Sequence, residues 1–157
     1  MYLIHQNVPA LCWGDPKDPP ILKTNTGRQR LNMLGAYNPD SHSFIHLTGE
    51  ENCNANRVIE YFEVIIKAYR RHPKIILYLD NAKYFKAEIV TQWLEDHPKL
   101  HIEFLPPYAP NLNLIERFWR FVKEKLVKNT YYEKYNRFRA KAFQLLNRVD
   151  EHVDEFK

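Results

Sequence analysis

Two carboxylates, Asp80 and Glu116, are the residues best placed to do chemistry. Asp80 ends the apolar run KIILYLD, and functional residues gather at such strand ends in α/β sheets. Glu116 lies in the first turn of a helical pattern, directly after the proline-rich stretch LPPYAPNLN. Carboxylates that converge from two elements suit Mg²⁺, which prefers oxygen ligands and takes one or two carboxylates plus substrate phosphate. The pattern therefore predicts a divalent cation site.

Both carboxylates also have an ordinary structural interpretation. Asp80 can begin a turn or cap the next helix together with Asn81, and Asn81 can instead orient Asp80 or contact a metal-bound water. An acidic residue in a first turn suits the helix macrodipole, prolines are tolerated just before a helix, and Asn111 or Asn113 can cap. At the level of single residues these alternatives stay open.

Hydrophobic periodicity predicts the elements that must position the two carboxylates. Strands are expected at 2–4, 21–26, 30–38, 43–49, 74–80 and 100–106, and helices at 54–71, 86–97, 114–129 and 131–156. The continuous apolar run at 74–80 is typical of a strand buried on both faces. If 74–80 and 100–106 run parallel around a crossover helix, their carboxyl ends meet and the following loop delivers Glu116 there. The order predicts one α/β domain over residues 1–157, a mixed sheet flanked by helices.

Composition narrows the class of protein. The chain has 157 residues and a net charge of +4, which permits but does not require binding to nucleic acid. With Cys12 and Cys53 as the only cysteines, no signal peptide and no apolar run of membrane-spanning length, a cytoplasmic protein without membrane association is expected. The histidines lack zinc-site spacing, and no phosphate-binding or dinucleotide-binding glycine motif occurs, so no small-molecule cofactor is expected.

Basic residues near the two carboxylates are candidates for contact with DNA phosphates. Such contacts bind without reading sequence, and the alternative for each residue is an ordinary solvated surface. The candidates are Arg28, Arg30, Lys83, Arg117, Arg120 and Lys123.

Two strings, LYLDNAKYF and LPPYAPNLNLIERFW, resemble the mariner-type transposases and their bacterial insertion-sequence relatives, and residues 81–115 separate the two carboxylates. The stretch from WGDPKDPP to TGRQRLNMLGAYNP resembles the early sheet of the bacterial branch. The resemblance implies a ribonuclease-H-like catalytic domain with an Asp, Asp, Glu or Asp triad, in which Asp80 is the second carboxylate and Glu116 the third. It implies Mg²⁺ or Mn²⁺ as cofactor, transposon ends and target DNA as partners, a homodimer, and strand cleavage and transfer as the activity.

The chain departs from this pattern at its first strand. The first triad Asp is expected just before Met1, and Asp15 and Asp18 are interpreted as turn residues. An incomplete first strand and a missing DNA-recognition region are therefore expected, with little strand cleavage by the chain alone. Phe85 replaces a usual His, which is expected to weaken DNA contact, and Leu114 replaces a usual Pro.

Two other functions remain open from the sequence. One is a degenerate domain that binds DNA or a partner transposase without cleaving. The other is an RNA-cleaving ribonuclease H enzyme, which shares the carboxylate chemistry but does not explain LPPYAPNLNLIERFW.

Overall fold

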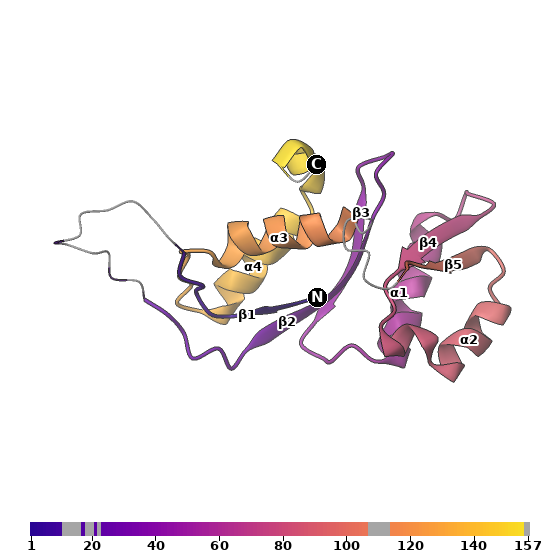
Figure 1. Cartoon of the computed structure of the whole chain (residues 1–157), viewed down its shortest axis with the longest axis horizontal. Coiled ribbons are helices and arrows are strands. Elements are labelled where there is room, and N and C mark those ends of the chain that lie inside the picture. Colours follow the sequence, from indigo (N-terminus) through magenta and orange to yellow (C-terminus); the bar gives the residue numbers. More distant parts are fainter. Residues whose placement is uncertain (11–16, 18–20, 22, 107–113, 156–157) are drawn as a thin grey trace.

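The strands form two small sheets that contribute to one α/β arrangement (Figure 1). The computed structural model describes residues 1–10, 17, 21, 23–106 and 114–155. The antiparallel sheet has the order β1 (Tyr2–Ile4), β2 (Arg30–Tyr37) and β3 (Phe44–Gly49). The second sheet pairs β4 (Ile75–Leu79) in parallel with β5 (Leu100–Phe104). Within the described residues no strand pairing joins the two sheets.

In the part of the chain that the structure describes, four α-helices and two short 3-10 helices surround these strands. They are α1 (Ala55–Ala68), η1 (Lys83–Lys86), α2 (Glu88–Glu95), α3 (Leu114–Val127), α4 (Tyr135–Leu146) and η3 (Val149–Glu155). None of the helices in the described ranges has the length and apolar character needed to cross a membrane.

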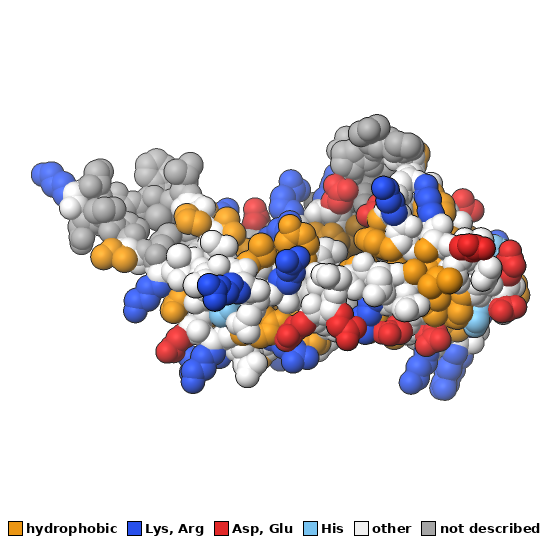
Figure 2. Space-filling model, turned by 90° about the horizontal axis from the view of Figure 1, so that it is seen from below, with side chains coloured by type: hydrophobic (Ala, Val, Ile, Leu, Met, Phe, Trp, Pro, Cys, Tyr) orange, Lys and Arg blue, Asp and Glu red, His pale blue; other side chains and the backbone are white. Residues whose placement is uncertain are grey.

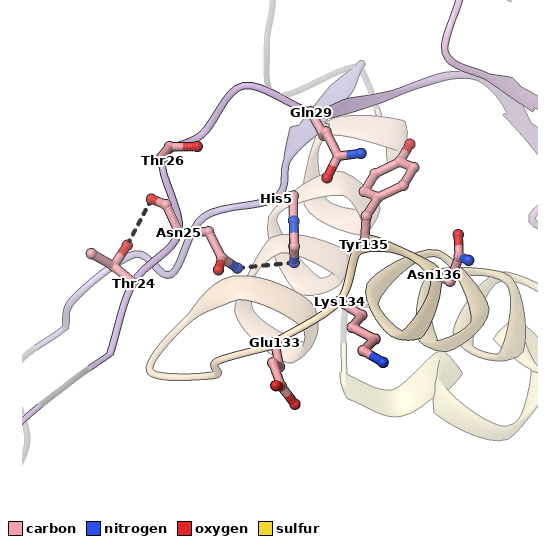
Figure 3. Close-up of a pocket in the computed structure, with 9 residues that line it drawn as sticks. All are labelled: His5, Thr24, Asn25, Thr26, Gln29, Glu133, Lys134, Tyr135 and Asn136. Carbon is pink, nitrogen blue, oxygen red and sulfur yellow. Dashed lines mark hydrogen bonds between the residues drawn. The ribbon is translucent and has the colours of Figure 1, made fainter.

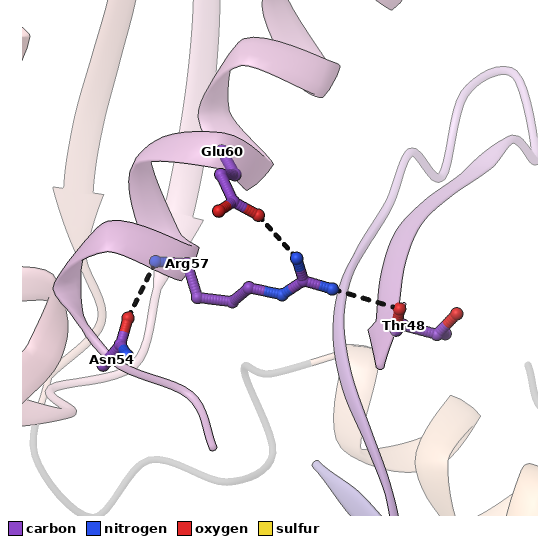
Figure 4. A network of polar contacts seen from close by, with 4 residues as sticks. All are labelled: Thr48, Asn54, Arg57 and Glu60. Carbon is purple, nitrogen blue, oxygen red and sulfur yellow. Dashed lines mark hydrogen bonds and ion pairs between the residues drawn. The ribbon is translucent and has the colours of Figure 1, made fainter. Parts of the chain in front are cut away.

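Helix α1 shows how local chemistry sets an element boundary (Figure 4). The side chain of Asn54 accepts a hydrogen bond from the backbone N–H of Arg57 at 2.9 Å, which satisfies a donor that the first turn would otherwise leave unpaired. The guanidinium of Arg57 donates to Glu60 on the same helix and, at 3.1 Å, to the carbonyl of Thr48 on β3. Asn54 is therefore the N-cap of α1.

The hydrophobic core consists of two clusters that meet at β2. Leu31 and Met33 belong to the cluster beneath α3 and α4, whereas Leu34 belongs to the cluster formed by α1, α2, β4 and β5. Side chains of successive strand residues point to opposite faces, so β2 presents one face to each cluster. Figure 1 shows the same division, with β2 and β3 between the two groups of elements.

Three predicted elements differ from the structure. Residues 21 and 23–26 form no strand: β1 and β3 occupy the two edges of β2, and Asn25 is instead held by its side-chain amide, which donates to the carbonyl of Tyr132 at 2.7 Å. The helix predicted at 131–156 is divided into α4 and η3, because the break at 147–148 lets Val149 and Val153 pack into the core.

The third difference concerns β4, which is buried on one face only. Ile75, Leu77 and Leu79 are buried, whereas the side chains of Ile76 and Tyr78 are 50% and 65% exposed. The uninterrupted apolar sequence predicted burial on both faces; among the described residues only the face toward α1 and α2 is covered.

Candidate metal centre

Asp80 directly follows the last residue of β4, at the end where β4 and β5 finish together. The parallel pairing predicted from the sequence is present, and the backbone N–H of Leu105 extends it by donating to the carbonyl of Leu79 at 2.8 Å. The carboxylate is exposed, and its Oδ1 accepts a hydrogen bond from the backbone N–H of Ala82 at 3.1 Å. This contact fixes one oxygen of Asp80 in a turn and leaves Oδ2 available to a ligand.

Asn81 ties this turn to the neighbouring strand. Its Nδ2 donates to the carbonyl oxygen of Leu105 at 2.7 Å, and its Oδ1 accepts from the ammonium of Lys86 at 2.6 Å. The side chain therefore points toward the end of β5, so any influence of Asn81 on the Asp80 carboxylate runs through the turn that they share.

Glu116 lies in the first turn of α3, which is anchored by buried Phe118, Val122 and Leu126. Glu116 itself is exposed, as are Arg120 and Lys123 at four and seven residues further along. Residues at these spacings share one face of an α-helix. The proline-rich approach to the helix and the candidate caps Asn111 and Asn113 lie outside the described residues, as do Asp15 and Asp18.

The amino group of Met1 links the two parts of the candidate site electrostatically. Burial lowers the pKa of this group, Lys123 lowers it further, and the charges of Cys53 and Asp80 act in the opposite direction. The ammonium also donates to the carbonyl of Met33 at 2.8 Å, so its position beside β2 is fixed.

Tyr84 gives a second measure of the environment of Asp80. Burial is the main cause that raises the pKa of its hydroxyl to about 12, and the negative charges of Asp80 and Cys53 add to the effect. The Tyr84 hydroxyl, which is carried by η1, is thus a neutral phenol close to the Asp80 carboxylate.

The donor set fits a hard divalent cation in part. Across the described ranges no group of three or more His, Cys, Asp or Glu side chains is close enough to hold a metal ion. Two carboxylates agree with the way Mg²⁺ is usually bound, with water and substrate phosphate as the remaining ligands.

The candidate DNA-binding residues are all exposed and come from several elements. They come from the segment before β2, the start of β2, η1 and α3: Arg28, Arg30, Lys83, Arg117, Arg120 and Lys123. The guanidinium of Arg30 lies over the ring of Tyr2, 5.9 Å from its centroid. On the face drawn in Figure 2, Lys and Arg side chains alternate with Asp and Glu. Net charge by itself therefore does not locate a DNA surface on that face.

A polar pocket of about 540 Å³ lies at the opposite end of β1 from Met1 (Figure 3). His5 lines it but is 6% exposed, with Nε2 2.8 Å from the carbonyl of Tyr132 and 2.9 Å from Nδ2 of Asn25. Neither Asp80 nor Glu116 lines this pocket.

Sequence reasoning missed Lys86 as part of the candidate site. Its ammonium contacts Asn81 and also lies 4.8 Å from the ring centroid of Phe104. The spacing of five residues from Asn81 carried no signal, because η1 is a single short 3-10 turn and periodicity had predicted a helix from residue 86.

Known proteins resemble this chain in sequence and in fold. A family model described as DDE superfamily endonuclease matches residues 7–139. An uncharacterized 39 kDa protein of insertion element IS630 from Shigella sonnei is 33% identical over 61 residues, which are 39% of this chain and 18% of that protein.

Solved structures show the same fold at low identity. The Mos1 strand transfer complex is similar with a TM-score of 0.69 and 17% identity, over 94% of this chain and 44% of that one. The mariner Mos1 paired end complex with Mn has a TM-score of 0.63 and 16% identity, over 100% of this chain and 54% of that one. The predicted ribonuclease-H-like fold class is confirmed. The chain spans about half the length of these structures and a smaller share of the IS630 protein.

Proposed function

The chain belongs to the DDE superfamily endonuclease family, and from this premise we propose that it is the catalytic part of an insertion-sequence transposase. Its reaction would be phosphoryl transfer on DNA. Water attacks a phosphodiester at the element end and breaks its P–O bond, which leaves a 3′-hydroxyl. That hydroxyl then attacks a phosphodiester of the target strand and displaces a second 3′-oxygen. No covalent intermediate with the protein is required.

Asp80 and Glu116 are the residues that would hold Mg²⁺ or Mn²⁺. The observation that carries this proposal is that Asp80 follows β4 at the end where β4 and β5 finish together, and that β5 is the strand that precedes α3, whose first turn holds Glu116. A bound divalent cation would supply charge stabilisation at the phosphate and lower the pKa of water. The solved Mos1 complexes with Mn and with Mg support this choice of ion.

DNA is the proposed partner, and phosphate contacts are its proposed mode of binding. A further similar structure is a Mos1 transposase paired-end complex with the left transposon end, which supports DNA as the partner. We propose in addition that two subunits act together. On α3 the proposed contacts are Arg117, Arg120 and Lys123, and further contacts are Lys83 on η1, Arg28 before β2 and Arg30 at the start of β2. Binding of this type weakens steeply as salt rises.

Calorimetric titration of Mg²⁺ and Mn²⁺ into the folded chain tests the metal site. We expect binding in the wild type and its loss in Asp80→Asn and in Glu116→Gln, since each removes one charged ligand. Glu103→Gln is the matched control, because Glu103 is an exposed carboxylate on β5 with no part in the proposed site. Equal binding in all four proteins would overturn the assignment.

Cleavage is tested separately with a labelled duplex that carries element ends. We expect weak nicking or none from the chain alone, because among the described residues no group of three or more His, Cys, Asp or Glu side chains is close enough to hold a metal ion. DNA binding without any response to metal would instead support the degenerate, non-cleaving alternative.

A further inference from the structure

The side chain of Lys86 connects the ends of β4 and β5 through its contacts with Asn81 and Phe104. It is the last residue of η1, and its ammonium donates to Oδ1 of Asn81 at 2.6 Å while it lies 4.8 Å from the ring centroid of Phe104, the last residue of β5. Asn81 in turn donates to the carbonyl of Leu105 at 2.7 Å. One cation thus contacts the residue that follows Asp80 and the residue that ends the neighbouring strand.

The contacts of Lys86 also restrict the Asp80 carboxylate, because Asp80 and Asn81 belong to the same turn. With Asn81 held by two hydrogen bonds, the backbone N–H of Ala82 is placed so that it donates to Oδ1 of Asp80 at 3.1 Å. On the other side, the backbone N–H of Leu105 donates to the carbonyl of Leu79 at 2.8 Å. Loss of the Lys86 contacts would free the turn that bears Asp80.

The contacts of Lys86 are exposed to solvent, so we expect them to orient the Asp80 turn and not to stabilise the fold as a whole. The Lys86 side chain is exposed and Phe104 is 42% exposed. Charge-assisted hydrogen bonds and cation–π contacts at such positions contribute little to global stability. They can still restrict the orientation of a ligand, and residues that orient metal ligands affect metal affinity strongly.

We propose that Lys86 is a positioning residue of the metal centre, which sets the orientation of the Asp80 carboxylate at the shared end of β4 and β5. The identity of the metal rests on the proposed function, whereas the restraint on the Asp80 turn does not. Lys86 acts through Asn81 and Phe104 and does not itself contact the metal or the reacting atoms.

The test compares Lys86→Met, which keeps the aliphatic stem but loses the charge and the donor, with Lys86→Arg, which keeps both. Lys74→Met, an exposed lysine just before β4, is the matched control. In metal-free protein, hydrogen exchange at the amides of Ala82 and Leu105 should accelerate several-fold in Lys86→Met and return toward the wild type in Lys86→Arg. Mn²⁺ affinity should fall by about tenfold or more in Lys86→Met and largely recover in Lys86→Arg.

The outcomes separate three cases. Unchanged exchange and unchanged Mn²⁺ affinity in Lys86→Met would overturn the proposal. A weaker dependence of DNA affinity on salt with unchanged exchange would also overturn it, since Lys86 would then be a phosphate contact. Faster exchange in a chain whose wild type binds no Mn²⁺ would support the restraint on Asp80 and count against the proposed function alone.

Discussion

The indole ring of Trp119 lies against the backbone of Gly35, so closely that a Cβ at Gly35 would be 2.8 Å from Cη2 of the indole. A Cβ there would approach the ring of Phe44 more closely still. Gly35 is in the middle of β2 and Trp119 is on α3, one turn after Glu116. The absent side chain of Gly35 therefore sets how near the helix that carries Glu116 comes to the sheet.

Gly35→Ala is expected to lower the free energy of unfolding by about 1–3 kcal/mol, since overpacking a close contact forces neighbouring side chains or backbone to move. Urea denaturation followed by circular dichroism measures the change. Phe44→Leu added to Gly35→Ala should recover part of the loss, because the smaller side chain makes room. A denaturation midpoint that stays at the wild-type value in Gly35→Ala would contradict the packing argument.

The outer edge of β4 is expected to exchange its amide hydrogens quickly. The N–H of Ile75 donates to Lys99 and the carbonyl of Leu79 accepts from Leu105, so the backbone groups of alternate residues 75, 77 and 79 point toward β5. The N–H groups of Ile76 and Tyr78 then point to the other edge, where the described residues provide no strand.

Hydrogen exchange followed by NMR checks this directly. Ile76 and Tyr78 should exchange at least about tenfold faster than Leu77, which lies between them and serves as an internal control. Equal protection of the three amides would show that another strand occupies this edge in solution, for example through association of two molecules.

His46 is expected to make stability depend on pH. Burial lowers the pKa of this imidazole from its ordinary value of 6.5, and its hydrogen bond with Asn147 acts in the opposite direction. Nδ1 is buried and has no hydrogen-bond partner among the described residues, so a proton there would have no acceptor. As the pH falls below 6.5, the unfolded chain takes up this proton before the folded chain does, and the free energy of unfolding decreases.

The measurement is urea denaturation between about pH 7.5 and pH 5. His46→Gln should flatten the decrease below pH 6.5, whereas His101→Gln, at an exposed position on β5, should leave it as in the wild type. The same pH slope in His46→Gln and in the wild type would remove His46 as its source.

Asn54→Ala is expected to destabilise the protein by about 1 kcal/mol, because the mutation leaves the backbone N–H of Arg57 without its side-chain acceptor. Asn56→Ala is the control, since Asn56 lies just inside α1 and alanine favours the helix interior. Thermal unfolding of both variants gives the comparison. Similar losses in the two would show that the cap contributes nothing specific.

Much of the fold was predictable from the sequence, and so were the places of Asp80 and Glu116 in it. The apolar periodicity that placed α1, α3, β4 and β5 depends on local residue order, and so does the position of Asp80 at a strand end and of Glu116 in a first helical turn. The parallel pairing of β4 with β5 followed from the general handedness of a βαβ crossover, and the structure confirms it.

Only the tertiary structure decided which contacts these elements make. The restraint of Asn81 by Lys86 and Leu105 joins residues from η1 and β5, and a short 3-10 turn leaves no periodic signal in the sequence. The exposure of Ile76 and Tyr78 could not be predicted. An apolar sequence indicates which side chains a strand favours burying, but it does not indicate whether another element packs against them. Likewise, whether residues 21–26 pair as a strand depended on which edge of β2 remained free, a property of the assembled sheet and not of the segment.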